Sequence, residues 1–329
     1  MKAHPFSRRA CLQVLTALVL AGAGLASFAQ SWPAKPIKLV VPFPPGGATD
    51  VLARVLAEKL PQKLGQPVVV ENKPGGGTVI GVTAVTKAPA DGYTVLVSAG
   101  SSFAVLPALK PNLSYDVEKD LATVNLSVTT PLVIVTSAAL PYKRFADLVA
   151  HDKAHPNSLR YSSYGAGTSP HLASELLTAV ANIQAEPVPY KGSSDALLAL
   201  LRGDVDFGME TIVAAMPHIK SGKLRALAVT MPSRSQYLPD VPGLDELKLS
   251  AASFLGYYGV AVAAGTPAPI IEKLSQAVND ILRTPETKEK MLTQSLDIVS
   301  KGPDEMRTFI RADMNKLREL GKRLNVQLE

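Results

Sequence analysis

The chain has 329 residues, of which 47% are hydrophobic and 19% are charged, a balance typical of a globular protein of one to three domains. This composition excludes an intrinsically disordered chain, a collagen-like repeat and a coiled coil. The 34 Lys and Arg residues against 28 Asp and Glu residues give a net charge of +6, which raises the question of nucleic-acid binding.

Residues 1–29 have the three parts of a secretory signal peptide. A basic segment precedes an apolar run from Leu12 to Leu25, and the small-x-small sequence Ser27-Phe28-Ala29 marks a cleavage site. The alternative is a transmembrane anchor, but glycines and polar residues interrupt the apolar run. Arg8-Arg9 and its neighbours partly match a twin-arginine signal, so export by the general secretory (Sec) route or by the twin-arginine route stays open.

Cleavage after Ala29 would remove 29 of the 329 residues and three basic side chains, leaving 300 residues with a net charge of +3. It would also remove Cys11, the single cysteine, so we expect no disulfide, no thiolate nucleophile and no cysteine-ligated zinc. The expected destination is a bacterial periplasm. The low net charge of the exported chain argues against nucleic-acid binding. The last helix argues against it too, because its basic residues alternate with acidic ones.

Beyond residue 29, short β-rich runs alternate with amphipathic stretches, which is typical of α/β architecture. Strands are expected at residues 37–41, 67–70, 94–98, 132–136, 159–163, 187–190, 205–209, 224–230 and 254–262. Helices are expected at residues 52–64, 145–151, 195–202 and 214–220. Two further helices are expected, one that ends at about residue 88 and one that follows the loop at 164–169 and ends at residue 181. The C-terminal third is expected to be helical, with Thr266 capping a helix that begins at Pro267 and with a last helix beginning at Pro303.

This number of strands and helices is larger than a single hydrophobic core usually accommodates. We therefore expect two α/β lobes. One lobe is discontinuous and comprises residues 30–129 and 254–329, and the other comprises residues 130–253. The chain is expected to cross between them near Ser127–Pro131 and near Ser250–Leu255.

The usual catalytic and metal-binding motifs do not occur: there is no G-x-S-x-G, H-E-x-x-H, Walker A or EF-hand pattern. His151 and His155 have helical spacing but lie in a polar stretch, which favours a solvated helix end over a metal site. The segment Gly75–Gly81 is one residue off a dinucleotide fingerprint and predicts a tight turn with close helix–strand packing. We therefore expect no metal and no cofactor. Asp50 and Arg54, four residues apart, are expected to form a structural ion pair.

Three loops have the composition of an anion site: Pro45 to Asp50, Ser98 to Ser102 and Gly165 to Ser169. Each follows a strand, and the first and third lead into helices. Such loops present free backbone N–H groups beside the positive end of a helix dipole, and Ser and Thr add neutral donors. The alternative is that these residues only cap helices and form turns. None of the loops contains Arg or Lys, and Lys191 is the nearest candidate for a direct cation.

Six motifs occur in a fixed order: Val41-Pro42-Phe43-Pro44-Pro45-Gly46-Gly47-Ala48-Thr49-Asp50 through Arg54, Val70 to Gly77, Asp91-Gly92-Tyr93-Thr94, Val188-Pro189-Tyr190-Lys191-Gly192, Gly222 to Thr230, and Gly265-Thr266-Pro267. Together they resemble the substrate-binding proteins of tripartite tricarboxylate transporters, the Bug or TctC family, over essentially the whole exported chain. The resemblance implies a type II periplasmic-binding-protein fold, in which two α/β lobes joined by a hinge close over a ligand cleft. It also implies a small organic acid as the ligand.

In that family the carboxylate lies between the first-strand loop and the glycine-rich loop of the second lobe, partly through ordered water. Carried over, this implies contacts from Gly46, Ala48 and Thr49 and, across the cleft, from Ser163, Gly167, Thr168 and Ser169. The full set of candidate ligand-binding residues is Pro45, Gly46, Gly47, Ala48, Thr49, Ser98, Ser101, Ser163, Gly167, Thr168, Ser169, Lys191 and Asp206.

The chain departs from the family pattern at two places. It has Glu210-Thr211 where many members have Asp-Asn, and Gly256-Tyr257 where many have Trp before the Tyr-Gly step. Both changes affect residues expected near the ligand or the hinge, so they bear on ligand choice.

The expected function is therefore a monomeric periplasmic solute-binding protein that delivers an organic acid to membrane permease subunits, without catalysis. One alternative is the ligand-sensing input of a sensor kinase. Another is a secreted α/β enzyme acting on a carboxylate substrate, for which the candidate groups are Asp50, His171, Asp206 and Glu210.

Overall fold

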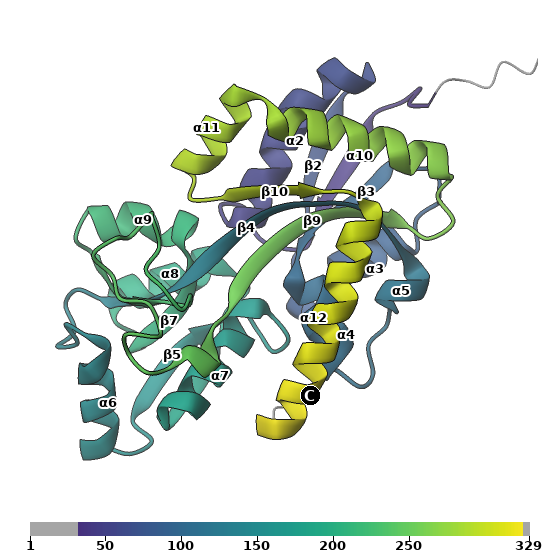
Figure 1. The fold of residues 1–329 in the computed structure, drawn as a ribbon. Coiled ribbons are helices and arrows are strands. Elements are labelled where there is room, and N and C mark those ends of the chain that lie inside the picture. The colour runs from purple at the N-terminus through teal and green to yellow at the C-terminus, as the bar shows by residue number, and fades with distance from the viewer. Residues whose placement is uncertain (1–31, 325–329) are drawn as a thin grey trace, which may run out of the picture. The chain divides into compact units, whose positions relative to one another are not determined.

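Two long strands, β4 (Leu121–Ser137) and β9 (Leu255–Ala263), connect two groups of shorter strands. They pair antiparallel, from Leu121 opposite Ala263 to Pro131 opposite Leu255. The first half of β4 belongs to one group of strands and its second half to the other, and Figure 1 shows the two groups toward opposite ends of these strands. The computed structural model describes residues 32–324, so the expected signal peptide at residues 1–29 lies outside the described residues.

The first group contains β1 (Ile37–Val41), β2 (Val68–Asn72), β3 (Thr94–Ala99) and β10 (Asp297–Lys301). β1 is parallel to both β2 and β3, β3 is antiparallel to β9, and β10 is antiparallel to β4. The helices that accompany this group are α2 (Ala48–Leu64), α3 (Val79–Thr86), α4 (Leu106–Leu109), α5 (Val117–Asp120), α10 (Ala268–Arg283), α11 (Pro285–Thr293) and α12 (Pro303–Leu324), with short helical turns η1 (Gly76–Thr78) and η2 (Ser101–Val105).

The second group contains β5 (Leu159–Ser163), β6 (Ala185–Pro189), β7 (Phe207–Thr211) and β8 (Leu224–Val229). β5 is parallel to β6 and β7, whereas β7 and β8 are antiparallel to β4. The accompanying helices are α6 (Phe145–Ala154), α7 (Ser169–Ala181), α8 (Ser193–Arg202) and α9 (Ile212–Lys220), and η3 (Ser250–Ala252) precedes β9. The expected α/β class with two lobes is confirmed. The lobe boundaries, 30–129 with 254–329 and 130–253, stay a prediction.

Most expected elements are found; β1 and β5 have the expected bounds, and α7 ends at Ala181 as expected. The predicted strands do not include residues 121–131 or β10. The segment 121–131 alternates apolar residues with Asn125, Ser127 and Thr130, which do not read as a buried strand. In the structure these polar groups are paired: Asn125 Nδ2 donates to Asn279 Oδ1 at 2.7 Å, and Thr130 Oγ1 donates to Ser295 O at 2.8 Å. Long-range hydrogen bonds thus make a buried strand that the local pattern hides.

The expected start of α10 was wrong by one residue. Pro267 has φ −56° and ψ 135°, so it is the N-cap and Ala268 is the first helical residue. The Thr266 hydroxyl donates to Ala263 O at 2.7 Å instead of accepting a helix N–H. Thr266 therefore closes the turn after β9, and the fixed φ of proline sets the direction in which α10 starts.

Buried apolar side chains cover the faces of both groups of strands. One cluster continues through both groups and includes Leu96, Phe103, Leu126 and Phe207, all at most 2% exposed. A second cluster lies between the far half of β4 and helices α8 and α9. Full burial of each such side chain contributes about 1.5–3 kcal/mol, so these clusters hold the strand ends that carry the loops in place.

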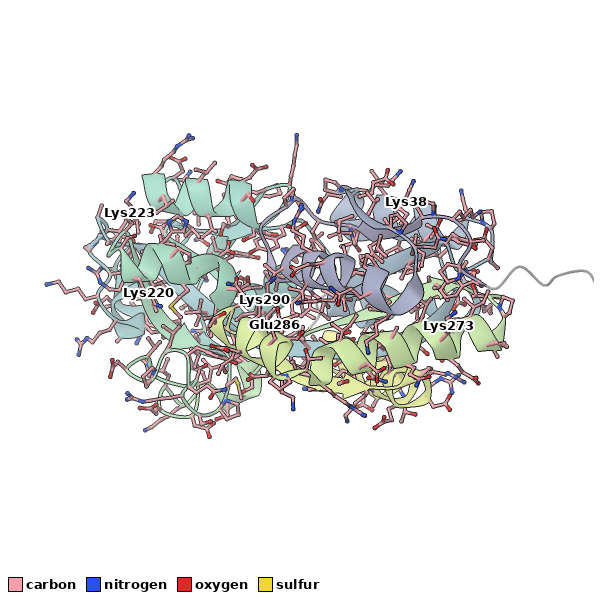
Figure 2. The ribbon with its side chains drawn as sticks, turned by 90° about the horizontal axis from the view of Figure 1, so that it is seen from above. Lys38, Lys220, Lys223, Lys273, Glu286 and Lys290 are labelled. Atoms are coloured by element: carbon pink, nitrogen blue, oxygen red, sulfur yellow. The ribbon has the colours of Figure 1, made fainter. Side chains whose placement is uncertain are left out.

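Helix α11 is attached to α2 by surface ion pairs. Lys59 Nζ lies 2.5 Å from Glu286 Oε1, and Lys290 Nζ lies 2.7 Å from Glu58 Oε2; Figure 2 shows Glu286 and Lys290 on α11. Water and salt screen these exposed pairs, so they add little stability. Within residues 32–324, no helix is both long enough and apolar enough to cross a membrane.

Candidate functional site

A small cavity of about 40 Å³ lies where loops from both groups of strands meet; we call it the inner cavity. Four helices begin at its wall. Ala48 and Thr49 are the first residues of α2, Ser169 is the first residue of α7, Ser193 is the first residue of α8, and Thr211 is the N-cap of α9. None of its lining residues is charged.

This arrangement favours binding of an anion, even though no cationic side chain lines the cavity. A helix N-terminus carries free N–H groups and the equivalent of about half a positive charge. Four such ends converge here with the hydroxyls of Thr49 and Ser101, which serve as neutral donors. A cavity needs roughly 10–15 Å³ to hold one water, so about 40 Å³ has room for a group the size of a carboxylate or a few waters.

The loop between β1 and α2 is shaped by glycine and by Asp50. Gly46 has φ +97°, a backbone conformation that favours glycine. The Asp50 carboxylate, 3% exposed, accepts hydrogen bonds from Gly46 N (3.0 Å), Arg54 Nε (2.8 Å) and Asn72 Nδ2 (2.9 Å). Burial favours a raised pKa for Asp50, but the hydrogen bonds from Arg54, Asn72 and Gly46 outweigh it and lower the pKa. The expected Asp50–Arg54 pair is confirmed.

Contacts between the two sides of the inner cavity are direct. Ser169 N donates to Ser101 Oγ at 2.9 Å, and the hydroxyls of Ser101 and Ser169 are 3.1 Å apart. The Ser194 hydroxyl donates to Pro45 O at 2.9 Å. A Cβ on Gly77 would lie 2.6 Å from Ala166 O, so this approach requires glycine. The two sides therefore touch at these points.

A larger groove of about 700 Å³, the outer groove, adjoins the inner cavity and shares Phe43 and Tyr164 with it. The glycine turn Gly75–Gly77 forms part of its wall. The prediction of a tight turn with close packing there is confirmed, because a Cβ on Gly81 would lie 2.6 Å from Pro42 Cβ. The exposed Lys191 lies at this groove and not at the inner cavity.

The structure brings together part of the predicted set. Gly47, Ala48, Thr49, Ser101 and Ser169 line the inner cavity, as expected for residues of two facing loops. Two further members of the set, Thr168 and Lys191, line the outer groove.

Five other predicted residues line neither space. Pro45 and Gly46 make the loop contacts described above, and Gly167, with φ +86°, shapes the loop before α7. The Ser98 hydroxyl is buried 2.6 Å from the Ser102 hydroxyl. Ser163 Oγ accepts from Gly165 N at 3.0 Å. These residues position loops and do not contact the space itself.

Asp206 does not belong to the site. It precedes β7 and accepts hydrogen bonds from Tyr142 Oη (2.9 Å) and Arg160 N (2.8 Å). Thr211, at the inner cavity, lies at the other end of β7. The expected strand at residues 205–209 lies two residues before the observed one.

Sequence reasoning missed Ser193 and Tyr164 as lining residues. A signal existed for Ser193, because Gly192-Ser193-Ser194 follows a strand and begins a helix, as in the three selected loops. Both side chains donate to the buried Glu210: the Tyr164 hydroxyl and the Ser193 hydroxyl (2.7 Å) share its Oε2. Burial raises the pKa of Glu210 to about 8.

The titratable groups considered for catalysis do not form an accessible set. Ser163 Oγ lies 2.9 Å from His171 Nδ1, but Ser163 is 1% exposed and lines neither space. Burial also lowers the pKa of His171. His151 and His155 have ring centroids 5.0 Å apart, and in the described part of the chain no three His, Cys, Asp or Glu residues are arranged to hold a metal ion.

Comparison with known proteins identifies the family. The family model described as the tripartite tricarboxylate transporter family receptor matches residues 52–326. Protein BugT of Bordetella pertussis is 38% identical over 95% of this chain and 98% of its own. The structure of R. palustris Rpa4515 with adipate has a TM-score of 0.86 and 28% identity, covering 90% of this chain and 99% of its own. That of MatC from Rhodopseudomonas palustris with bound malate has a TM-score of 0.84 and 27% identity, covering 88% and 99%. The chain therefore belongs to the tripartite tricarboxylate transporter receptor family, whose members are substrate-binding proteins.

Proposed function

We propose that this protein captures a small organic acid in the periplasm and delivers it to membrane permease subunits. The observation that carries the proposal is the convergence of the N-termini of α2, α7, α8 and α9 on one uncharged cavity. This set of donors suits a carboxylate held by backbone N–H groups and hydroxyls. Family membership supports the membrane partner, and the adipate and malate in two related structures support the ligand class.

Capture proceeds by closure of the two groups of strands around the acid. The donors come from both groups, so the ligand binds more tightly when the groups approach, and its binding energy shifts the population toward the closed form. The contacts of Ser169 with Ser101 and of Ser194 with Pro45 stabilise this form. The strands β4 and β9, which run between the groups, are the natural hinge.

The proposal contains no chemical step. Asp50 is occupied by three hydrogen bonds from its own loop and helix, and Asp206 lies at the far end of β7. The pair formed by Ser163 and His171 is buried away from both spaces. These groups therefore hold the structure together.

The test is thermal unfolding and calorimetric titration of residues 30–329, freed of co-purified ligand. The panel contains acetate, malate, adipate and citrate, with malamide and adipamide as uncharged analogues. At one hundred times its Kd, a ligand stabilises the fold by about 2.7 kcal/mol, which raises Tm by several degrees at this size. We expect such a shift with one or more acids and none with the amides, and we expect the acid to be recovered unchanged.

Thr49→Val tests the inner cavity, because it removes a lining hydroxyl at nearly constant volume. Loss of one hydrogen bond to an anion costs about 1.5–3 kcal/mol, so the Kd should rise roughly 10- to 150-fold. Thr293→Val, on the exposed end of α11, is the matched control and should leave the Kd unchanged. Equal binding of acids and amides, or an unaltered Kd in Thr49→Val, would overturn the assignment.

A further inference from the structure

Glu210 is a completely buried carboxyl group directly behind the wall of the inner cavity. It is 0% exposed, and its Oε2 accepts from Tyr164 and Ser193, both of which line the cavity. Its Oε1 is also buried and has no hydrogen-bond partner among the described residues. The next residue, Thr211, is itself at the cavity wall, and its buried hydroxyl has no partner either. Two buried polar atoms at the end of β7 thus lack a partner, one in a residue of the cavity wall and one directly behind that wall.

Within residues 32–324, no cationic side chain pairs with this carboxyl group. Its hydrogen-bond partners are two hydroxyls, and none of the residues that line the cavity is basic. A buried carboxylate without a cation is unfavourable, and a second negative charge arriving in the adjoining cavity would make it more so. The neutral acid avoids both costs, and its O–H adds a donor beside the anion site.

We propose that Glu210 sets the charge state of the ligand site: it stays protonated when an organic anion is bound, so that ionised Glu210 and bound carboxylate exclude each other. Capture of the acid is then coupled to a proton on Glu210. The inference rests on the proposed function and adds to it that Glu210 determines which pH range permits binding.

The groups around Glu210 leave it as the one that titrates near neutral pH. Tyr164 comes from the loop after β5, Tyr258 from β9 and Ser193 from α8, while Val133 of β4 pairs with Glu210 in the sheet. Burial raises the pKa of Tyr164 far above its ordinary value, and burial together with the charge of Glu210 raises that of Tyr258, so both phenols remain neutral. The raised pKa of Glu210 itself, about 8, agrees with the geometry.

The experiment measures the Kd of malate and of adipate by calorimetry at pH 6, 7, 8 and 9, in buffers of different ionisation enthalpy. If only the protonated form binds and its pKa is about 8, affinity should be about tenfold weaker at pH 9 than at pH 7. Binding at pH 9 should also take up close to one proton. Glu210→Gln mimics the neutral acid and should give a flat pH profile without proton uptake.

Glu175→Gln is the matched control, because Glu175 is a partly buried acid that, like Glu210, accepts a hydrogen bond from a tyrosine, here Tyr161. It should keep the tenfold change. A pH-independent Kd in the unmodified protein, or a tenfold change that persists in Glu210→Gln, would overturn the inference while leaving the proposed function standing. No binding of malate, adipate or any other panel acid at any pH would instead refute the proposed function, and this inference with it.

Discussion

Replacing Asp50 by Asn tests whether this carboxylate holds the first loop in place. Two donors, Gly46 N and Arg54 Nε, share Asp50 Oδ2, and Asn72 Nδ2 donates to Oδ1. An asparagine has only one acceptor oxygen, so whichever way its amide points, an NH₂ group faces a donor. Asn72 cannot simply turn over to compensate, because its NH₂ group also donates to Phe43 O at 3.0 Å.

The expected loss of unfolding free energy follows from the number of hydrogen bonds that Asp50 accepts. Arg54 is 56% exposed in its side chain and can turn to water, whereas Asp50 is buried. At least one partly buried hydrogen bond to a charged group is lost, which costs about 1–3 kcal/mol. Urea unfolding at pH 7 should therefore show Asp50→Asn less stable by this amount. Glu289→Gln, an exposed acid-to-amide change on α11, serves as control and should stay within about 0.5 kcal/mol of the unmodified protein.

The difference in unfolding free energy between Asp50→Asn and the unmodified protein should also depend on pH, in a direction set by the lowered pKa of Asp50. The folded pKa of Asp50 is lowered, so the stability that its charge contributes is fully present above the unfolded value of about 3.9. This contribution is lost as the pH falls through the folded pKa. The gap between Asp50→Asn and the unmodified protein should therefore be constant from pH 7 to about pH 5 and should shrink below about pH 4. A gap no larger than that of the control, or one that persists unchanged at low pH, would refute the reasoning.

Three further predictions concern packing and Glu210. Gly81→Ala places a Cβ 2.6 Å from a proline of the β1 loop and should cost about 1–3 kcal/mol in urea unfolding, whereas Gly302→Ala, with nothing within 4 Å, should cost less than about 0.5 kcal/mol. Leu200→Ala on α8 empties a fully buried position and should cost about 2–5 kcal/mol; Leu198→Ala on the same helix, 50% exposed, should be near neutral, and equal losses would contradict the packing. Burial raises the folded pKa of Glu210 to about 8, so the native state keeps a proton that the unfolded chain releases above about pH 4.3, and stability should fall as pH rises through this window. Glu210→Gln should remove that part of the decline, and an unchanged slope in a series of urea midpoints would count against a buried neutral acid.

The local patterns of the sequence were enough to predict the alternation of strands and helices. Four of the five residues of Ile37–Val41 are apolar and buried, and proline and glycine residues follow the run and end the strand, so β1 and its loop follow from short-range chemistry. The same holds for Thr168, which caps α7 as its side-chain oxygen accepts from His171 N. Where pairing depends on distant partners, as in residues 121–131, the local pattern failed.

The sequence by itself determined that three loops of this chain have the composition of anion sites and that cations are missing from them. Only the tertiary structure decided which loop ends meet. Asp206 and Thr211 belong to one short segment, yet β7 carries them to opposite ends, and only Thr211 reaches the inner cavity. Ser193 and Glu210 come together through the packing of α8 on β7, at a hydrogen-bond distance of 2.7 Å. Composition and capping act within a few residues, whereas the convergence of helix ends depends on how the strands order themselves in the sheet, and no single segment encodes that order.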